Sequence, residues 1–93
     1  MPVAVASVMN SDQDSQGPSG RRGVFIVDDH PLVRESLASL IARQADLIVC
    51  GQAETCGEAF EQIARLQPDA ALVDLSLEGE SGLDLIKQLL NLP

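Results

Sequence analysis

The stretch "VFIVDDHPLVRES", residues 24–36, places four apolar residues directly before two adjacent carboxylates. A continuous apolar run of this kind is typical of a strand that is covered on both faces, as in a parallel sheet. Pro31 follows the acidic pair closely and suits the first position of a helix, where its missing N–H leaves no helical hydrogen bond unmade. The stretch therefore predicts a buried strand, a short acidic loop at its carboxyl end, and a helix.

Two more largely continuous apolar runs follow, "LIVCGQA" at residues 47–53 and "AALVD" at residues 70–74. Segments whose apolar residues recur at helical spacing come after each of the three runs. A β-α-β-α-β-α order at this spacing predicts an α/β fold with a doubly wound parallel sheet and right-handed crossovers. We expect the strand order 2-1-3, which places the first predicted strand between the other two.

The predicted helices have clear end signals. Thr55 and Glu58 form a capping-box pattern at the start of the second helix, and Pro68 stops it. Ser81 is placed to cap the third helix, with Asp84 near the positive end of the helix dipole. The residues that mark one face of the first helix at helical spacing are Val33, Leu37, Leu40, Ile41 and Gln44.

The chain before the first strand has a different composition. Residues 10–22 are rich in Ser, Gln, Asp and Gly and have no apolar periodicity. We therefore expect residues 1–22 to be a disordered leader and residues 23–93 to form the ordered domain. The first nine residues are weakly apolar, but they lack a basic segment and are too short to span a membrane.

Charge and cysteine spacing limit the classes of partner. The formal net charge is −8, and the charges within residues 1–22 cancel, so the excess lies on residues 23–93. Such a domain would repel the phosphate backbone of nucleic acid and attract cations or basic partners.

Cys50 and Cys56 fit neither a C-x-x-C redox pair nor a zinc site, so we expect reduced, mostly buried cysteines and a cytoplasmic protein.

Three carboxylates fall at the ends of predicted strands. Asp28 and Asp29 follow the first strand, and Asp74 ends the third. In an open α/β sheet the binding crevice lies outside the carboxyl ends of the strands, where the strand order reverses. With the order 2-1-3 the first and third strands are neighbours, about 4.8 Å apart. We therefore expect the three carboxylates to converge on one cleft.

Carboxylates this close require either a raised pKa or a bound cation, and their oxygens suit Mg²⁺. An Asp beside Mg²⁺ is also a competent nucleophile toward phosphorus. Taken singly, Asp28 reads equally well as a helix cap and Asp74 as a turn residue; the three together favour a site. His30 is assigned to a capping or surface position, without a catalytic role.

Two segments of the chain resemble a known family of domains. The segments "VFIVDDHPLVRESL" and "DAALVDLSLEGESGLDLIKQL" resemble the receiver domain of bacterial response regulators, most closely the NarL/FixJ-like subgroup. The similarity spans roughly Gly23 to Leu92. It implies a partial flavodoxin-like or CheY-like fold and a signalling module, not an enzyme, that receives a phosphoryl group from a sensor histidine kinase.

The resemblance also implies residue roles. Asp74 resembles the phosphoacceptor, and Asp28 and Asp29 resemble the acidic pair that holds Mg²⁺, with Asp29 the more direct ligand. Ser76 resembles the position whose backbone carbonyl completes the metal site. Gly82 matches the family glycine in the loop that leads into the third helix.

The sequence departs from the family pattern at its end. A complete receiver continues through two further strands, which carry a Ser/Thr and a Lys that contact the phosphoryl group, and this subgroup usually adds a helix-turn-helix domain that binds DNA. We therefore expect a C-terminally truncated receiver with an exposed edge on the third strand. We also expect an unstable fragment that aggregates or forms a homodimer, and that binds neither nucleic acid nor membrane directly.

Two other interpretations of the function remain. A haloacid-dehalogenase-like aspartyl phosphotransferase also places an Asp at a strand end beside Mg²⁺, but it requires a second Asp two residues later, where this chain has Ser76. The other reading is a non-catalytic fragment that binds partners through its acidic face.

Overall fold

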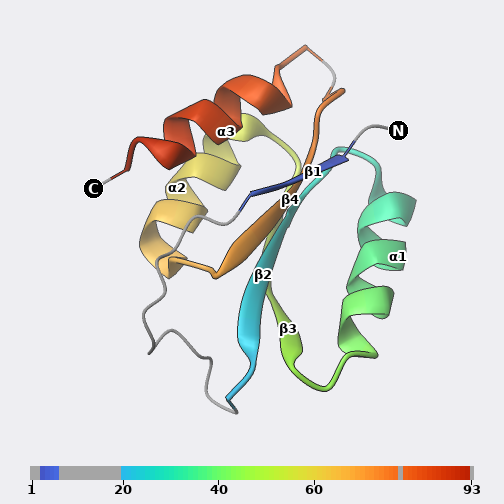
Figure 1. Ribbon diagram of the computed structural model, residues 1–93. Helices are drawn as coiled ribbons and strands as arrows, with labels where there is room; N and C mark the ends of the chain where they lie inside the picture. Colours follow the sequence, from blue (N-terminus) through green and yellow to red (C-terminus); the bar gives the residue numbers. More distant parts are fainter. Residues whose placement is uncertain (1–2, 7–19, 78, 93) are drawn as a thin grey trace.

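The computed structural model describes residues 3–6, 20–77 and 79–92, and Figure 1 shows their arrangement. The elements follow one another along the chain as β1 (Val3–Ala6), β2 (Arg22–Val27), α1 (Pro31–Ala42), β3 (Leu47–Ala53), α2 (Cys56–Leu66), β4 (Ala70–Asp74) and α3 (Gly82–Leu90). None of the helices in these ranges is long and apolar enough to cross a membrane.

The four strands form one sheet in the order β1-β4-β2-β3. β2 pairs in parallel with both β3 and β4, so the predicted order 2-1-3 is confirmed for the three strands that the sequence predicted. Val27 lies opposite Val73 of β4 and opposite Ala53 of β3. The carboxyl ends of the three parallel strands therefore meet at the same edge of the sheet.

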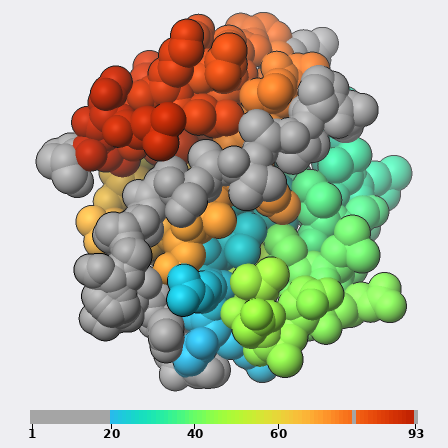
Figure 2. Space-filling model, in the orientation of Figure 1, coloured from blue at the N-terminus to red at the C-terminus, as the bar shows by residue number. Residues whose placement is uncertain are grey.

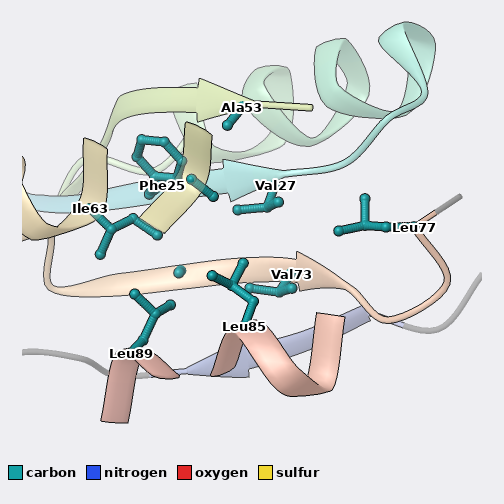
Figure 3. Close-up of a cluster of buried hydrophobic side chains, with 10 residues drawn as sticks. Phe25, Val27, Ala53, Ile63, Val73, Leu77, Leu85 and Leu89 are labelled. Carbon is teal, nitrogen blue, oxygen red and sulfur yellow. The ribbon is translucent and has the colours of Figure 1, made fainter. Parts of the chain in front are cut away.

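Helices cover both faces of the sheet, with α1 on one face and α2 and α3 on the other (Figure 1). Alternate side chains of β2 point to opposite faces of the sheet. Phe25 and Val27 pack toward α2 and α3, and Val24 and Ile26 pack toward α1. Figure 3 shows the larger cluster, in which Phe25 faces Ile63 of α2. In the space-filling view, α3 and α1 lie on opposite sides of the molecule (Figure 2).

The predicted helix ends are confirmed. Pro31 is the first residue of α1. The Thr55 hydroxyl accepts a hydrogen bond from the Glu58 N–H, and the Ser81 hydroxyl accepts one from the Asp84 N–H. Beyond α2, Gln67 adopts a left-handed conformation at φ 51°, directly before Pro68.

The predicted apolar face of α1 is only partly correct. Ile41 is buried and Leu37 packs partly against Val24 and Ile26, but Leu40 is 55% exposed. The sheet contacts a narrow stripe of α1, and residues four apart such as Leu37 and Ile41 share that stripe. Leu40 lies about 100° around the helix from Ile41 and therefore points away from the sheet. Gln44, which was predicted on the same face, is exposed.

The predicted disordered leader differs from the structure at its two ends. Val3–Ala6 forms β1, which pairs antiparallel with β4 from Val3 opposite Asp74 to Ala6 opposite Ala71, and Arg22 already belongs to β2. Residues 1–2 and 7–19 of the predicted leader lie outside the described residues. The predicted exposed edge of β4 is therefore wrong, because β1 supplies main-chain hydrogen-bonding groups along it.

Candidate functional site

The candidate site lies at the carboxyl edge of the parallel strands. Asp74 is the last residue of β4, and Asp28 follows the last residue of its neighbour β2. Asp28, Asp29, His30 and Asp74 each offer one ligand atom, and these atoms all lie within 4.8 Å of one another. The three carboxylates that the sequence predicted to converge do so, and a histidine joins them.

Asp28 is buried and held from several directions. Its main-chain N–H donates to the Ala53 carbonyl at 3.1 Å, which continues the pairing of β2 with β3. Its Oδ1 accepts a hydrogen bond from the His30 main-chain N–H at 2.8 Å, a local turn in which a carboxylate binds the backbone two residues on. The strand end and this turn together fix the direction of the Asp28 carboxylate.

Asp74 uses the same kind of turn. Its side chain is fully buried, and its Oδ1 accepts two hydrogen bonds of 2.8 Å from Ser76, one from the main-chain N–H and one from the hydroxyl. Its Oδ2 is the atom that faces the cluster, 3.8 Å from His30 Nδ1. Ser76 thus orients Asp74 through its N–H and hydroxyl, while the predicted role of its backbone carbonyl stays a prediction.

His30 is the residue of the cluster that the sequence prediction left out. It occupies the N-cap position of α1 and is half exposed, as predicted, but its side chain makes no capping hydrogen bond. Instead, its Nδ1 lies 3.0 Å from Asp28 Oδ1 and 2.9 Å from Asp29 Oδ1. The sequence signal was its place one residue after the acidic pair, at the same strand end.

The carboxylates also change the protonation of His30. The hydrogen bond with Asp28 is the main cause that raises the pKa of the imidazole above its ordinary value of 6.5, and the charges of Asp29, Asp28 and Asp74 add to it. Partial loss of solvent around the ring acts in the opposite direction. The cluster therefore favours a positive charge at this position.

Two buried carboxylate oxygens indicate that the residues of the cluster fit a cation. Asp28 Oδ2 and Asp74 Oδ2 have no hydrogen-bond partner among the described residues, although their side chains are only 1% and 0% exposed. A carboxylate oxygen buried without a partner is costly, and a divalent cation removes that cost. Hard oxygen donors are the ligands that Mg²⁺ prefers, so the donor set fits this ion.

Comparison with known proteins agrees with this arrangement. Residues 24–93 match the family of response regulator receiver domains. The chain belongs to this family. The match begins within the buried strand β2 and includes the whole acidic cluster.

The similar receiver proteins include several transcription regulators. The chain is 37% identical over 68 residues to the DNA-binding transcriptional activator DevR/DosR of Mycobacterium tuberculosis, covering 73% of this chain and 31% of that protein. It is 38% identical over 66 residues to the transcriptional regulatory protein LiaR of Bacillus subtilis, covering 71% of this chain and 31% of that protein. The chain thus spans about a third of the length of these relatives.

A solved structure supports the receiver fold. A two-component response regulator of the LuxR family from Aurantimonas sp. SI85-9A1 superposes with a TM-score of 0.71 at 33% sequence identity, over 74% of this chain and 49% of that chain. The predicted fold class, a partial CheY-like α/β sheet, is confirmed by this likeness and by the strand order.

Two residues outside the cluster support the receiver site. Arg34 of α1 donates a hydrogen bond of 2.7 Å from Nη1 to the Asp28 main-chain carbonyl, and its Nη2 lies 3.7 Å from Glu54 Oε2. Gly82 is buried at the start of α3, against the main chain of Asp74 and Leu75. The sequence indicated Gly82 through the family resemblance, but it gave no signal for Arg34.

Proposed function

We propose that this receiver domain accepts a phosphoryl group on Asp74 as part of a two-component signalling system. The observation that supports the proposal is the state of the Asp74 carboxylate. It is fully buried, it is oriented by Ser76, and its Oδ2 has no hydrogen-bond partner among the described residues. A buried, oriented carboxylate beside a divalent cation is a competent nucleophile toward phosphorus.

Mg²⁺ is the proposed cofactor. Asp28, Asp29 and Asp74 would hold it, together with the backbone carbonyl of Ser76. When bound, the ion neutralises charge on the oxygens of the incoming phosphoryl group. Arg34 stabilises this arrangement, because its guanidinium donates a hydrogen bond to the Asp28 main-chain carbonyl.

The proposed phosphodonor is a phosphohistidine of a sensor histidine kinase. A carboxylate oxygen of Asp74 attacks phosphorus, the P–N bond of the donor breaks, and the electron pair returns to the histidine nitrogen of the kinase. Each chain accepts one phosphoryl group in this step, so the module acts as a stoichiometric signal carrier and not as an enzyme with turnover.

The output function is proposed by analogy with the relatives. One of them is a DNA-binding transcriptional activator, and we propose that the longer protein to which this receiver corresponds is a DNA-binding regulator in the cytoplasm. The receiver itself carries a net charge of −8 and would repel nucleic acid, so DNA contact would come from a part outside this chain. Homodimer formation is part of the same proposal.

The test is incubation of the protein with Mg²⁺ and labelled acetyl phosphate, followed by mapping of the acyl phosphate. We expect no more than one label per chain, on Asp74, and loss of the label in Asp74→Asn or on removal of Mg²⁺. Asp46→Asn is the matched control, because Asp46 is an exposed carboxylate outside the cluster and its loss leaves the label unchanged.

Other results would support the alternatives. Repeated turnover of a phosphomonoester would indicate a haloacid-dehalogenase-like enzyme, against which the Ser76 position counts, because it lacks the second Asp of that class. A folded protein that takes no label and binds no Mg²⁺ would instead indicate a non-catalytic acidic interaction module.

A further inference from the structure

The position of the His30 ring inside the acidic cluster raises the question of what the imidazole does there. His30 is the only histidine of the chain. Its Nδ1 has three carboxylate oxygens around it, Asp28 Oδ1 at 3.0 Å, Asp29 Oδ1 at 2.9 Å and Asp74 Oδ2 at 3.8 Å. A helix cap has no need of such contacts, and the ring makes no capping hydrogen bond.

These separations match those between ligands of one small cation. In an octahedral site with bonds of about 2.1 Å, adjacent ligands lie roughly 3.0 Å apart and opposite ligands about 4.2 Å apart. The distances from His30 Nδ1 to Asp28 and Asp29 equal the adjacent spacing, and the distance to Asp74 lies between the two values. Nδ1 is thus placed as a fourth donor atom of the cluster.

A second observation indicates that the cluster takes a ligand. Asp28 Oδ2 and Asp74 Oδ2 belong to side chains that are 1% and 0% exposed, and no described residue gives either oxygen a hydrogen bond. Buried oxygens of this kind need a donor or a cation. The imidazole contacts Asp28 through Oδ1, so it leaves the Oδ2 atom without a partner.

We propose that His30 Nδ1 is a ligand of the divalent cation in this site, and that it makes the site favour a transition-metal ion such as Mn²⁺ over Mg²⁺. The proposal rests on the metal site of the proposed function and adds to it a nitrogen donor and a metal preference. Carboxylate and carbonyl oxygens suit both ions, whereas imidazole favours transition metals.

The location of the ring agrees with this role. His30 is half exposed, so the imidazole can adjust its position around the ion at little cost, while its main-chain N–H stays tied to Asp28 Oδ1. The competing explanation is an ion pair, in which a protonated ring occupies the position of the cation and leaves when metal binds. The two explanations differ in whether nitrogen is bonded to the metal.

Pulsed electron paramagnetic resonance of the Mn²⁺-loaded protein at pH 8 tests this difference. Mn²⁺ is the suitable probe, because the thiols of Cys50 and Cys56 would compete with the carboxylate site for the softer Zn²⁺. We expect a ¹⁴N coupling on Mn²⁺ that changes to a ¹⁵N coupling after labelling with ¹⁵N-histidine, which marks His30 alone. The coupling is absent in His30→Gln.

Equilibrium titrations measure the metal preference. We expect the ratio of the Mg²⁺ to the Mn²⁺ dissociation constant to fall about tenfold in His30→Gln. Glu61→Gln, which removes an exposed charge on α2, serves as the control and leaves the ratio unchanged. Because His30 is half exposed, circular dichroism of the variant should match the wild type.

The outcomes separate this inference from the proposed function. Mn²⁺ binding without nitrogen coupling, and with the same ratio in His30→Gln, overturns the role of His30, while Mg²⁺-dependent labelling of Asp74 would still stand. A folded wild-type protein that binds neither ion overturns the role of His30 and the metal part of the proposed function together.

Discussion

Gly82, the first residue of α3, lies directly against the main-chain carbonyl oxygen of Asp74. A β-carbon at this position would overlap that oxygen and would lie 2.9 Å from the Leu75 Cα. Both neighbours are backbone atoms and cannot turn aside as a side chain could. The start of α3 can therefore reach the candidate phosphoacceptor only because residue 82 has no side chain.

Gly82→Ala should destabilise the protein by about 1–3 kcal/mol, the usual cost of overpacking a buried site. The displaced loop should also weaken Mg²⁺ binding. Urea unfolding measures the first effect and a Mg²⁺ titration the second. The control is Gly57→Ala in α2, where an added β-carbon meets nothing within 4 Å; it should be neutral or stabilising, because Ala favours the helix. Equal effects of the two substitutions would contradict the packing argument.

Arg34 is predicted to fix the acidic loop. Arg34→Gln removes the 2.7 Å hydrogen bond to the Asp28 carbonyl, and we expect a loss of about 1–3 kcal/mol in unfolding free energy. The Mg²⁺ affinity should fall roughly tenfold, as for other residues that orient ligands. Arg43→Gln, an exposed position after α1, is the control for the loss of charge. If both variants bind Mg²⁺ equally well, Arg34 does not position the site.

Much of the site could be predicted from the sequence, because its carboxylates follow strand ends. Strand type was predictable from the apolar runs, whereas the order 2-1-3 does not follow from them alone. With that order, parallel strands bring their carboxyl ends to one edge, and Asp28, Asp29 and Asp74 converge there. The end signals of α2 and α3 were predictable for a similar reason, since Thr55 and Ser81 act on N–H groups within the same turn.

The features that the sequence did not predict depend on distant contacts. The His30 ring contacts Asp28 and Asp29, and it also lies 3.8 Å from Asp74, which is 44 positions later. Local sequence predicts only a helix cap for a residue in this position before Pro31. β1 depends on the free edge of β4, while Val3–Ala6 is a short segment without local end signals. The direction of Leu40 depends on how narrow a stripe of α1 the sheet covers.

The pKa of His30 gives a pH-dependent prediction. In the metal-free protein, NMR titration should give a pKa above 6.5, and Asp28→Asn should lower it, because Asp28 is the main cause of the shift. A pKa that is raised in the folded state stabilises the fold fully below about pH 6.5, and this contribution is lost as the pH rises through the folded value. Saturating Mg²⁺ should lower the pKa. A value at or below 6.5 without metal would contradict the contacts with the carboxylates.

Cys56 should react slowly with alkylating reagents. Burial, followed by the charge of Glu80, raises the pKa of its thiol to about 11. At pH 8 only about one thiol in a thousand is then ionised. In a Cys50→Ala background, we expect the iodoacetamide rate to increase with pH well beyond 9. Glu80→Gln should accelerate the reaction at pH 8, because it removes a negative charge that disfavours the thiolate. An unchanged rate would contradict this contribution of Glu80.

The pairing of β1 with β4 predicts that the N-terminal strand protects the sheet edge. β1 runs antiparallel along β4 and covers it as far as Asp74, opposite Val3. Removal of residues 1–6 leaves the main-chain groups of β4 on that side without a partner, and an unpaired edge promotes association with another chain. We therefore expect faster amide hydrogen exchange in β4 and a shift toward dimers or larger species in analytical ultracentrifugation.

The remaining strands provide the internal control for this deletion. β3 lies at the opposite edge of the sheet and does not pair with β1, so its amide exchange should change little if the fold stays intact. Equal acceleration in β3 and β4 would indicate global unfolding. Unchanged exchange in β4, with a monomeric protein, would contradict the protective role of β1, because the edge would then be stable without it.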